Sequence, residues 1–313
     1  MKVIFFGTSS FSAHILAFLI DQGIEILAVI TRPDRPQKRS KRLTACAVKT
    51  WVLTNHSNLP LYQPEKASTP EMEHCLRAYN PDCFVVVSYG EIISQKLLDI
   101  PRIMSLNVHP SLLPKYRGAS PIQFALIDGA KTTGVTIIEM TTQMDAGDIL
   151  AQETIAIPFD ITCRELEKKL CDMGANILFK VLHSLSKGEI SKIPQKHHEA
   201  TYVKKITSSM AKLTWDRCAI ELHNLVRAFN PKPGAWIDLK IKGQLHRLKV
   251  WKSIVVDRLG SPGDILVYDH QQWIVACRKQ ALSLLEVQLE GKKKLAFPDF
   301  FRGQVIPPIL KTH

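Results

Sequence analysis

With 313 residues and 45% hydrophobic side chains, the chain is long enough to form two hydrophobic cores. It has no run of about 18 apolar residues, which argues against a membrane-spanning helix, and its first residues indicate a strand rather than a signal peptide. The net charge of +12 is unevenly spread, because residues 201–313 carry +10 and residues 1–200 only +2, which favours a polyanionic partner for the C-terminal part.

The first 190 residues alternate between short apolar runs and stretches with helical periodicity. Helices are predicted at Ser10–Gln22 and at Ile161–Lys187, where the apolar side of the second includes Leu166, Leu170 and Leu178. The predicted strands are Lys2–Gly7, Ile24–Thr31, Cys83–Tyr89, Met104–Val108, Val135–Met140 and Ile149–Ile157. This alternation predicts an α/β domain with a doubly wound, mostly parallel, Rossmann-like sheet, whose ligands bind beyond the carboxyl ends of the strands.

The C-terminal part has a different pattern. A polar, irregular stretch precedes a predicted helix from about Asp216 to Phe229, whose apolar positions face inward. Five short alternating strands follow, at Ala235–Lys242, Gln244–Lys252, Asp264–Tyr268, Trp273–Cys277 and Leu282–Glu290. They predict a small, OB-like β-barrel, a common nucleic-acid platform. We therefore expect a catalytic domain at 1–189, a linker at 190–206 and a basic barrel at 207–313.

Neither a nucleotide fingerprint nor a metal signature is present. The turn after the first strand opens a helix but lacks Gly-x-Gly-x-x-Gly, because Ser9 stands where the motif has its second glycine. The seven cysteines are scattered without a C-x-x-C pair, which is typical of reduced thiols in a cytoplasmic protein. The pair His197-His198 lies in a polar stretch without partner ligands. We expect no metal and a cytoplasmic location.

The segment Met104–Pro121 carries the strongest functional signal. Asn107 and His109 stand two apart on a predicted strand, so their side chains point to the same side. Asp145 lies in a turn-rich segment between two later strands. An amide, an imidazole and a carboxylate in such places can polarise a carbonyl and move protons. Each residue alone also fits a capped turn or a hydrogen-bonded histidine, but together they favour chemistry.

Two basic segments lie outside this motif. The loop Arg32–Arg42 contains six basic residues and one acid, and it follows the second strand at the edge where His109 is expected. It is either a solvated loop or a phosphate-binding one. The run Lys292–Lys294 is either a surface turn or a phosphate contact, whereas Phe300 and Phe301 are predicted to fill the barrel core.

The chain resembles the folate-dependent formyltransferase superfamily in Asn107-x-His109, in the run Ser111–Gly118 and in Asp145. Its C-terminal half is similar to the members that act on charged initiator tRNA. The segments that carry this second similarity are Arg227–Trp236, Gly291–Lys293 and Asp299–Gly303. The resemblance extends over nearly the whole chain.

The resemblance implies formyl transfer from 10-formyltetrahydrofolate to the amino group of methionine on initiator tRNA. Asn107 and His109 would stabilise the oxyanion of the tetrahedral centre, and Asp145 would pair with His109 and help remove the amine proton. The folate would bind beside Ser111, Leu112, Leu113, Pro114, Tyr89 and Gly90. The tRNA would contact Arg39, Lys41, Arg42, Lys292, Lys293 and Lys294. The protein would act as a monomer and would not bind a membrane.

Two alternatives remain open. A formyltransferase of the same kind could act on a small amine, such as a nucleotide sugar or glycinamide ribotide, and the basic C-terminal half argues against this. The second alternative is a non-catalytic RNA-binding protein that keeps only the fold of an enzyme. The intact Asn107, His109 and Asp145 argue against it.

Overall fold

The structure is a computed structural model that describes residues 1–36, 43–241 and 244–303. The described chain forms two compact units, and each takes residues from more than one stretch of the sequence. The first unit contains residues 1–119, 132–156 and 167–203. The second contains residues 120–131, 157–166 and the chain from 204 onward. Whether the functional division lies at 1–189, 190–206 and 207–313 stays a prediction.

A seven-stranded sheet organises the first unit. Its order is β10 (Ile149–Ala156), β9 (Thr132–Glu139), β7 (Met104–His109), β6 (Cys83–Val87), β1 (Lys2–Gly7), β2 (Glu25–Ile30) and β5 (Leu61–Tyr62). All neighbours pair in parallel except β9, which is antiparallel to both β7 and β10. The predicted mostly parallel α/β sheet is therefore confirmed.

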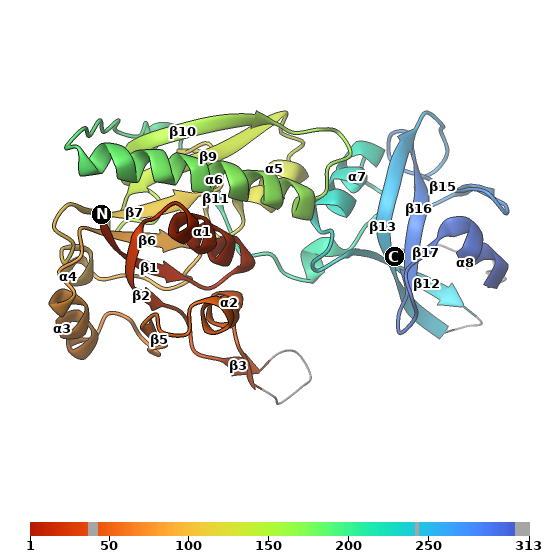
Figure 1. Cartoon of the computed structure of the whole chain (residues 1–313). Helices are drawn as coiled ribbons and strands as arrows, with labels where there is room; N and C mark the ends of the chain where they lie inside the picture. The colour runs from red at the N-terminus through yellow and green to blue at the C-terminus, as the bar shows by residue number, and fades with distance from the viewer. Residues whose placement is uncertain (37–42, 242–243, 304–313) are drawn as a thin grey trace. The chain divides into compact units, whose positions relative to one another are not determined.

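Helices cover both faces of this sheet. Figure 1 shows the long helix α6 (Cys163–Ser186) beside α1 (Ser10–Asp21), and Gly174 of α6 packs closely against Val108 and Ile15. On the other face, Leu76 of α3 (Pro70–Ala78) and Leu97 of α4 (Gln95–Leu98) join a core around Phe84. Strand β6 is buried at every position, as a central parallel strand should be. The described part of this unit also contains the α-helix α2 (Ala47–Asn55) and a short 3-10 helix at His197–Glu199.

Helix α6 confirms the predicted apolar side. Its predicted inward positions are all buried, namely Leu166, Leu170, Ile177, Leu178, Val181 and Leu182. Six strands of two residues in the described chain were not foreseen, because two residues are too few to show a periodicity. Two of them, β5 and β17 (Leu295–Ala296), join the larger sheets. The other four pair with one another. They are β3 (Arg35–Pro36) paired with β4 (Leu43–Thr44), and β8 (Arg117–Gly118) paired in parallel with β11 (Tyr202–Val203).

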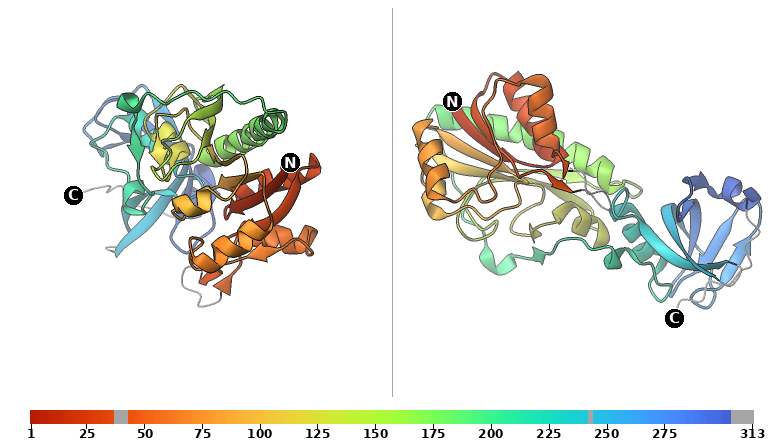
Figure 2. Two further views of the ribbon diagram at one scale, coloured as in Figure 1. Left: turned by 90° about the vertical axis from the view of Figure 1, so that its left-hand side faces the viewer. Right: turned by 90° about the horizontal axis from the view of Figure 1, so that it is seen from below.

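The second unit is built on an antiparallel, six-stranded sheet. Its strands are β12 (Ala235–Ile241), β13 (Gln244–Val256), β14 (Ile265–Tyr268), β15 (Trp273–Ala276), β16 (Ala281–Leu289) and β17 (Leu295–Ala296). The order β12-β13-β16-β15-β14 leaves β12 and β14 at the two ends among the described residues. Figure 2 shows these strands curling into a half-barrel, which confirms the predicted small barrel-like domain.

Helix α7 (Ala219–Ala228) fills the concave core with the aromatic residues Trp215, Phe229 and Trp273. Phe300 of α8 (Phe297–Gly303) is buried in the same core and Phe301 packs against it, as predicted. The helix α5 (Pro121–Ile127) and the stretch 157–166 join this unit through polar contacts and ring stacking, and Ile127 packs against its core. Buried Arg227 donates to the carbonyl oxygen of Leu126 at 3.4 Å, and His223 stacks on Phe159 with ring centroids 4.9 Å apart.

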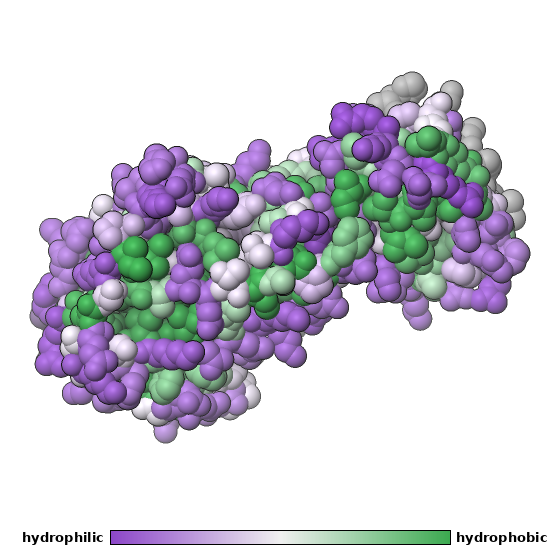
Figure 3. Space-filling view, turned by 90° about the horizontal axis from the view of Figure 1, so that it is seen from above, coloured by the Kyte–Doolittle hydropathy of each residue, from purple (hydrophilic) through white to green (hydrophobic). Residues whose placement is uncertain are grey.

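The surface is mixed in character. In Figure 3, hydrophilic side chains surround several patches of hydrophobic ones on the face that is seen. Within the described ranges, no helix combines the length and the apolar character that crossing a membrane requires.

The buried aromatic pair Phe6 and Phe84, with ring centroids 5.0 Å apart, generates a stability prediction. The change Phe84→Ala should lower the free energy of unfolding by about 3–5 kcal/mol, because it leaves a cavity in the core. Leu53→Ala is the control: Leu53 is 53% exposed on α2, and its loss should cost no more than about 0.5 kcal/mol. Urea unfolding followed by circular dichroism measures both, and equal losses would contradict the assigned core.

Candidate active site

Strand β7 carries Asn107 and His109 to the carboxyl end of the sheet. It pairs with β6 on one side and with β9 on the other, where Asn107 lies opposite Ile138 and His109 opposite Thr136. With hydrogen-bonded neighbours on both sides, the strand has little freedom to shift. The two side chains leave the same face of β7, as their spacing predicts, and both approach Asp145.

The carboxylate of Asp145 is the meeting point of the site. Its Oδ1 accepts a hydrogen bond from Asn107 Nδ2 at 3.3 Å, and its Oδ2 accepts one from the backbone N–H of Gly118 at 2.8 Å. The Nδ1 atom of His109 lies 3.6 Å from Oδ2, an ion-pair distance that is longer than a hydrogen bond. The side chains of His109 and Asp145 are only 5% and 14% exposed. The three residues predicted from the sequence therefore converge in a largely desolvated place.

The imidazole of His109 is oriented from its far side. Its Nε2 atom lies 3.0 Å from the carbonyl oxygen of Tyr116. Because a carbonyl can only accept, Nε2 carries the proton in this contact. The other ring nitrogen, Nδ1, is left facing Asp145 and the open end of the strand. This arrangement fixes which ring nitrogen can take part in chemistry beside the carboxylate.

The loop after His109 is tied to the sheet. The N–H of Ser111 donates to the carbonyl oxygen of His109 at 2.9 Å across Pro110, an inverse γ-turn whose φ suits proline. The hydroxyl of Thr136 donates to the carbonyl oxygen of Ser111 at 2.6 Å and accepts from the N–H of Leu113 at 3.2 Å. The Ser111 hydroxyl donates to the carbonyl oxygen of Lys115 at 2.7 Å. The loop is thus held in one shape before any ligand binds.

Strands β9 and β10 complete this support. Gln152 Nε2 on β10 donates to the carbonyl oxygen of Leu113 at 3.0 Å. Gly134 on β9 lies so close that an added Cβ would stand 2.0 Å from the carbonyl oxygen of Glu153 and 2.5 Å from a Leu112 methyl carbon. A glycine is therefore required for the loop and the two strands to pack together.

Tyr89 and Gly90 stand at the same end of the sheet but differ in exposure. The Tyr89 ring is 2% exposed and packs edge-on against Phe6, so its aromatic face belongs to the core. Burial raises the pKa of the Tyr89 hydroxyl above its usual range. Gly90 is the exposed residue of the two. Polar contacts hold the main chain here, because Thr8 Oγ1 donates to the carbonyl oxygen of Tyr89 and Arg32 donates to that of Gly90 at 2.8 Å. Their predicted folate contact stays a prediction.

Sequence reasoning missed the segment 195–203, which was assigned to the linker. Gln195 is buried, and its side-chain amide donates to the carbonyl oxygens of Asp145 and Gly147. Tyr202 and Val203 pair with Arg117 and Gly118, directly beside the carboxylate. The sequence gives little signal for this role, because the stretch is polar and only the Tyr202-Val203 step resembles a strand.

The predicted cationic residues fall into two groups. Arg39, Lys41 and Arg42 lie outside the described residues. Lys292, Lys293 and Lys294 are exposed between β16 and β17, and Lys294 is paired with Glu286 at 2.7 Å. Across the part of the chain that the structure describes, no group of three or more His, Cys, Asp and Glu side chains could hold a metal ion.

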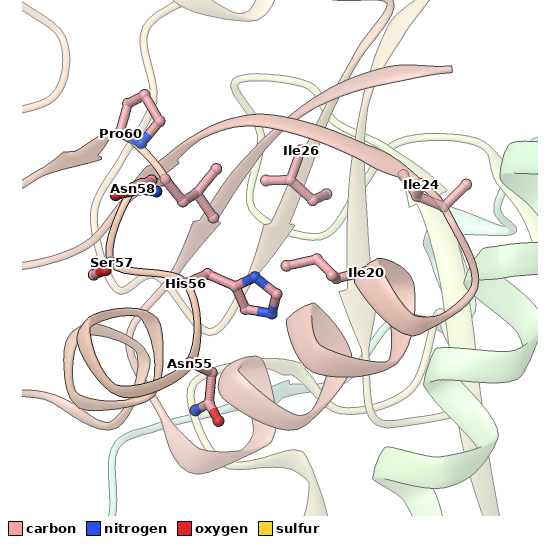
Figure 4. A pocket seen from close by; sticks show the side chains of 9 residues that line it. Ile20, Ile24, Ile26, Asn55, His56, Ser57, Asn58 and Pro60 are labelled. Carbon is pink, nitrogen blue, oxygen red and sulfur yellow. The ribbon is translucent and has the colours of Figure 1, made fainter.

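A separate pocket of about 460 Å³ lies at the opposite end of the sheet, where β2 begins. Figure 4 shows isoleucine side chains and the His56 ring around it. It is lined by Ile20, Ile24, Ile26, Asn55, His56, Ser57, Asn58, Leu59 and Pro60. It contains none of the residues that converge on Asp145.

Both halves of the chain match a known family. Residues 1–182 match the formyl transferase family and residues 205–305 its C-terminal domain. The chain is 45% identical over 304 residues to "Methionyl-tRNA formyltransferase" of Protochlamydia amoebophila (strain UWE25), covering 97% of this chain and 95% of that one. It is 40% identical over 307 residues to the protein of the same name from Chlamydia pneumoniae, with the same two coverages.

Solved structures with the same fold are more distant in sequence. HypX from Aquifex aeolicus in complex with tetrahydrofolic acid is 19% identical with a TM-score of 0.64, covering 99% of this chain and 49% of that one. The sugar 3N-formyl transferase WlaRD is 18% identical with a TM-score of 0.64, covering 94% and 99%. These two structures support the fold alone.

The β8–β11 pair generates a prediction at Gly118, which has φ +110° and whose added Cβ would lie 2.4 Å from the carbonyl oxygen of Val203. Gly118→Ala should separate the two strands and expose the N–H that binds Asp145. Gly188→Ala is the matched control, since Gly188 also has a positive φ (+74°) but nothing within 4 Å.

The free energy of unfolding should fall by more than about 1 kcal/mol in both variants, because alanine is strained at a positive φ. Only Gly118→Ala should speed amide hydrogen exchange in residues 115–120, as measured by mass spectrometry. Equal exchange in the two variants would show that the close contact does not hold the Gly118 amide.

Proposed function

The chain belongs to the formyl transferase family, and from this we infer that it transfers a formyl group from 10-formyltetrahydrofolate to the amino group of methionine on initiator tRNA. Two relatives, at 45% and 40% identity, match along nearly their whole length and carry the name "Methionyl-tRNA formyltransferase". They therefore favour this acceptor. The sugar enzyme, at 18%, supports the fold alone. The observation that carries the chemistry is the convergence of Asn107 and His109 on the Asp145 carboxylate.

We propose the following roles. The methionine amine attacks the formyl carbon and forms a tetrahedral centre whose oxygen becomes negative. The amide N–H of Asn107 and the Nδ1–H of His109 in its protonated, imidazolium form stabilise that oxygen, because the Nε2–H is already donated to Tyr116. Asp145 accepts the amine proton, directly or through water. The bond to the folate nitrogen then breaks, and this nitrogen takes up the proton that Asp145 accepted, which leaves Asp145 as a carboxylate again. The buried setting strengthens each of these interactions, because little water competes for the charges.

For the donor, we propose that the folate lies along Ser111–Pro114 and the main chain of Tyr89 and Gly90. The support is that Thr136 and Gln152 already hold the loop in one shape, so little ordering is required when a ligand binds. Because the Ser111 hydroxyl is fully buried and donates within the loop, its role is to shape the loop rather than to touch the folate.

For the acceptor, we propose that residues 1–189 are catalytic, that 190–206 form the connection and that 207–313 bind tRNA. The support is the net charge of +10 on residues 201–313. Arg39, Lys41, Arg42 and Lys292–Lys294 are proposed to contact its phosphates. We further propose a monomer in the cytoplasm, in keeping with seven cysteines that are all free thiols.

Labelled formyl transfer tests this function directly. The full chain is mixed with 10-formyltetrahydrofolate that carries a labelled formyl group, and with initiator Met-tRNA, an aminated nucleotide sugar or glycinamide ribotide in parallel. We expect label on the methionine amine only. Label on a small amine, with none on the tRNA, would favour the small-amine enzyme, and no label on any acceptor would favour a non-catalytic RNA-binding protein.

The assigned roles predict large losses of turnover. His109→Ala and Asp145→Asn should each reduce kcat by about 10²–10⁴-fold, the usual effect of removing an acid–base group. The control is the exposed pair His14 and Asp172, which are 2.8 Å apart, and His14→Ala and Asp172→Asn should leave kcat unchanged. Single-turnover assays on folded variants decide this. Near-normal turnover in either site variant would refute its assigned role.

The proposed tRNA contacts predict a change in salt dependence. Each phosphate contact adds about 0.7–0.9 to the slope of log affinity against log salt concentration. Replacing Lys292 and Lys293 by alanine should therefore reduce that slope by about 1–2. The same replacement at Lys168 and Lys169, which are exposed on α6, is the control and should not change it. Filter binding at several salt concentrations measures the slope, and equal slopes for parent and Lys292/Lys293 variant would remove these lysines from the interface.

A further inference from the structure

We propose that Gln195 is a positioning residue for Asp145, and that Arg117 holds Gln195 in the required orientation. The proposal rests on the catalytic role of Asp145 proposed above. It concerns residues that do not themselves touch the reacting atoms, because both side chains are buried behind the carboxylate, with only 5% and 2% of their surface exposed.

The turn that carries Asp145 needs support from outside. Asp145 has φ +52°, a left-handed conformation that an L-residue adopts at a cost of about 1–3 kcal/mol. The turn also packs tightly, since a Cβ added at Gly147 would stand 1.8 Å from the carbonyl oxygen of Glu139. A strained turn beside a catalytic group persists only where its surroundings fix it.

Gln195 supplies that support with a single amide group. Its Nε2 donates to the carbonyl oxygen of Asp145 at 2.9 Å and to that of Gly147 at 2.7 Å. The two N–H bonds of one amide nitrogen thus bridge both sides of Ala146. Because both acceptors belong to the main chain, the contact sets the position of the turn and leaves the carboxylate available for Asn107, His109 and Gly118.

Arg117 determines which way the Gln195 amide points. Its Nε and one terminal nitrogen donate to Gln195 Oε1 at 3.2 and 2.7 Å. A guanidinium has donors only, so the amide oxygen must face Arg117 and the amide nitrogen must face the turn. The remaining donors reach His197 Nδ1 at 3.0 Å and the Tyr202 hydroxyl at 3.2 Å.

The same short strand acts on Asp145 by a second route. Gly118, the residue after Arg117, donates its N–H to Asp145 Oδ2 at 2.8 Å. Strand β8 thus holds the carboxylate directly through Gly118 and the main chain of the turn indirectly through Arg117 and Gln195. Losing the second contact should let the carboxylate move relative to His109 Nδ1, and displacement of a catalytic group by about 1 Å can cost 10²-fold in rate.

The test compares Gln195→Leu and Gln195→Glu with the parent as full chains. Leucine removes both contacts, whereas glutamate keeps the shape and an oxygen for Arg117 but has no N–H for the turn. Both variants should lower kcat by about 10- to 100-fold, with KM for Met-tRNA and for the folate within about threefold of the parent. Gln95→Leu, at an exposed glutamine bonded to Asp99 on the surface, is the control and should behave as the parent.

Amide hydrogen exchange of residues 115–120 gives a readout that does not depend on activity. It should become faster in both Gln195 variants, since the Gly118 N–H loses a well-placed acceptor, and stay unchanged in Gln95→Leu. Loss of kcat together with faster exchange supports the proposal. Parental kcat, or a kcat loss with unchanged exchange, overturns it.

If activity falls only in proportion to the folded fraction measured by circular dichroism, Gln195 has a merely structural role and the proposal is also overturned. A parent that does not formylate Met-tRNA would instead count against the proposed function, which separates the two failures.

Discussion

The site depends on the hydrogen bonds that Asn107 and Gly118 donate to the carboxylate of Asp145. A carboxylate removed from water must be given donors, and here a side-chain amide and a backbone N–H supply them at 3.3 and 2.8 Å. The donors come from β7 and from β8, so the carboxylate joins parts of the chain that are far apart in sequence. Gly118 can pair with β11 here only because it lacks a side chain, since an added Cβ would stand 2.4 Å from the carbonyl oxygen of Val203.

The segment after helix α6 is part of this construction. It returns to the carboxyl end of the sheet, where its strand β11 pairs with β8, whose Gly118 N–H binds the Asp145 carboxylate. It also places the buried side chain of Gln195 against the turn that carries Asp145. Thr201 adds a backbone and a side-chain acceptor for the N–H groups of Arg117 and Tyr116, both at 2.8 Å. A stretch that connects two parts of the sequence therefore also shapes the site.

Much of this architecture follows from the sequence, and the exceptions have physical reasons. Continuous apolar runs predict the central strands, and the two-residue spacing of Asn107 and His109 predicts their shared direction. Gln195 could not be found, because a buried glutamine in a polar stretch looks like any solvated one until its partners are known. The aromatic ring of Tyr89 ends an apolar run, and the sequence does not reveal that it packs on Phe6 rather than facing a ligand.

The central claim is that His109 and Asp145 act as one unit across their 3.6 Å separation. A double-mutant cycle tests it: single-turnover rates are measured for the parent, His109→Ala, Asp145→Asn and the double variant. Groups that act together give strongly non-additive losses. We predict that the double variant is no more than about threefold slower than the slower single variant. If the two losses multiply, the residues act independently, and the account of a shared catalytic unit is wrong.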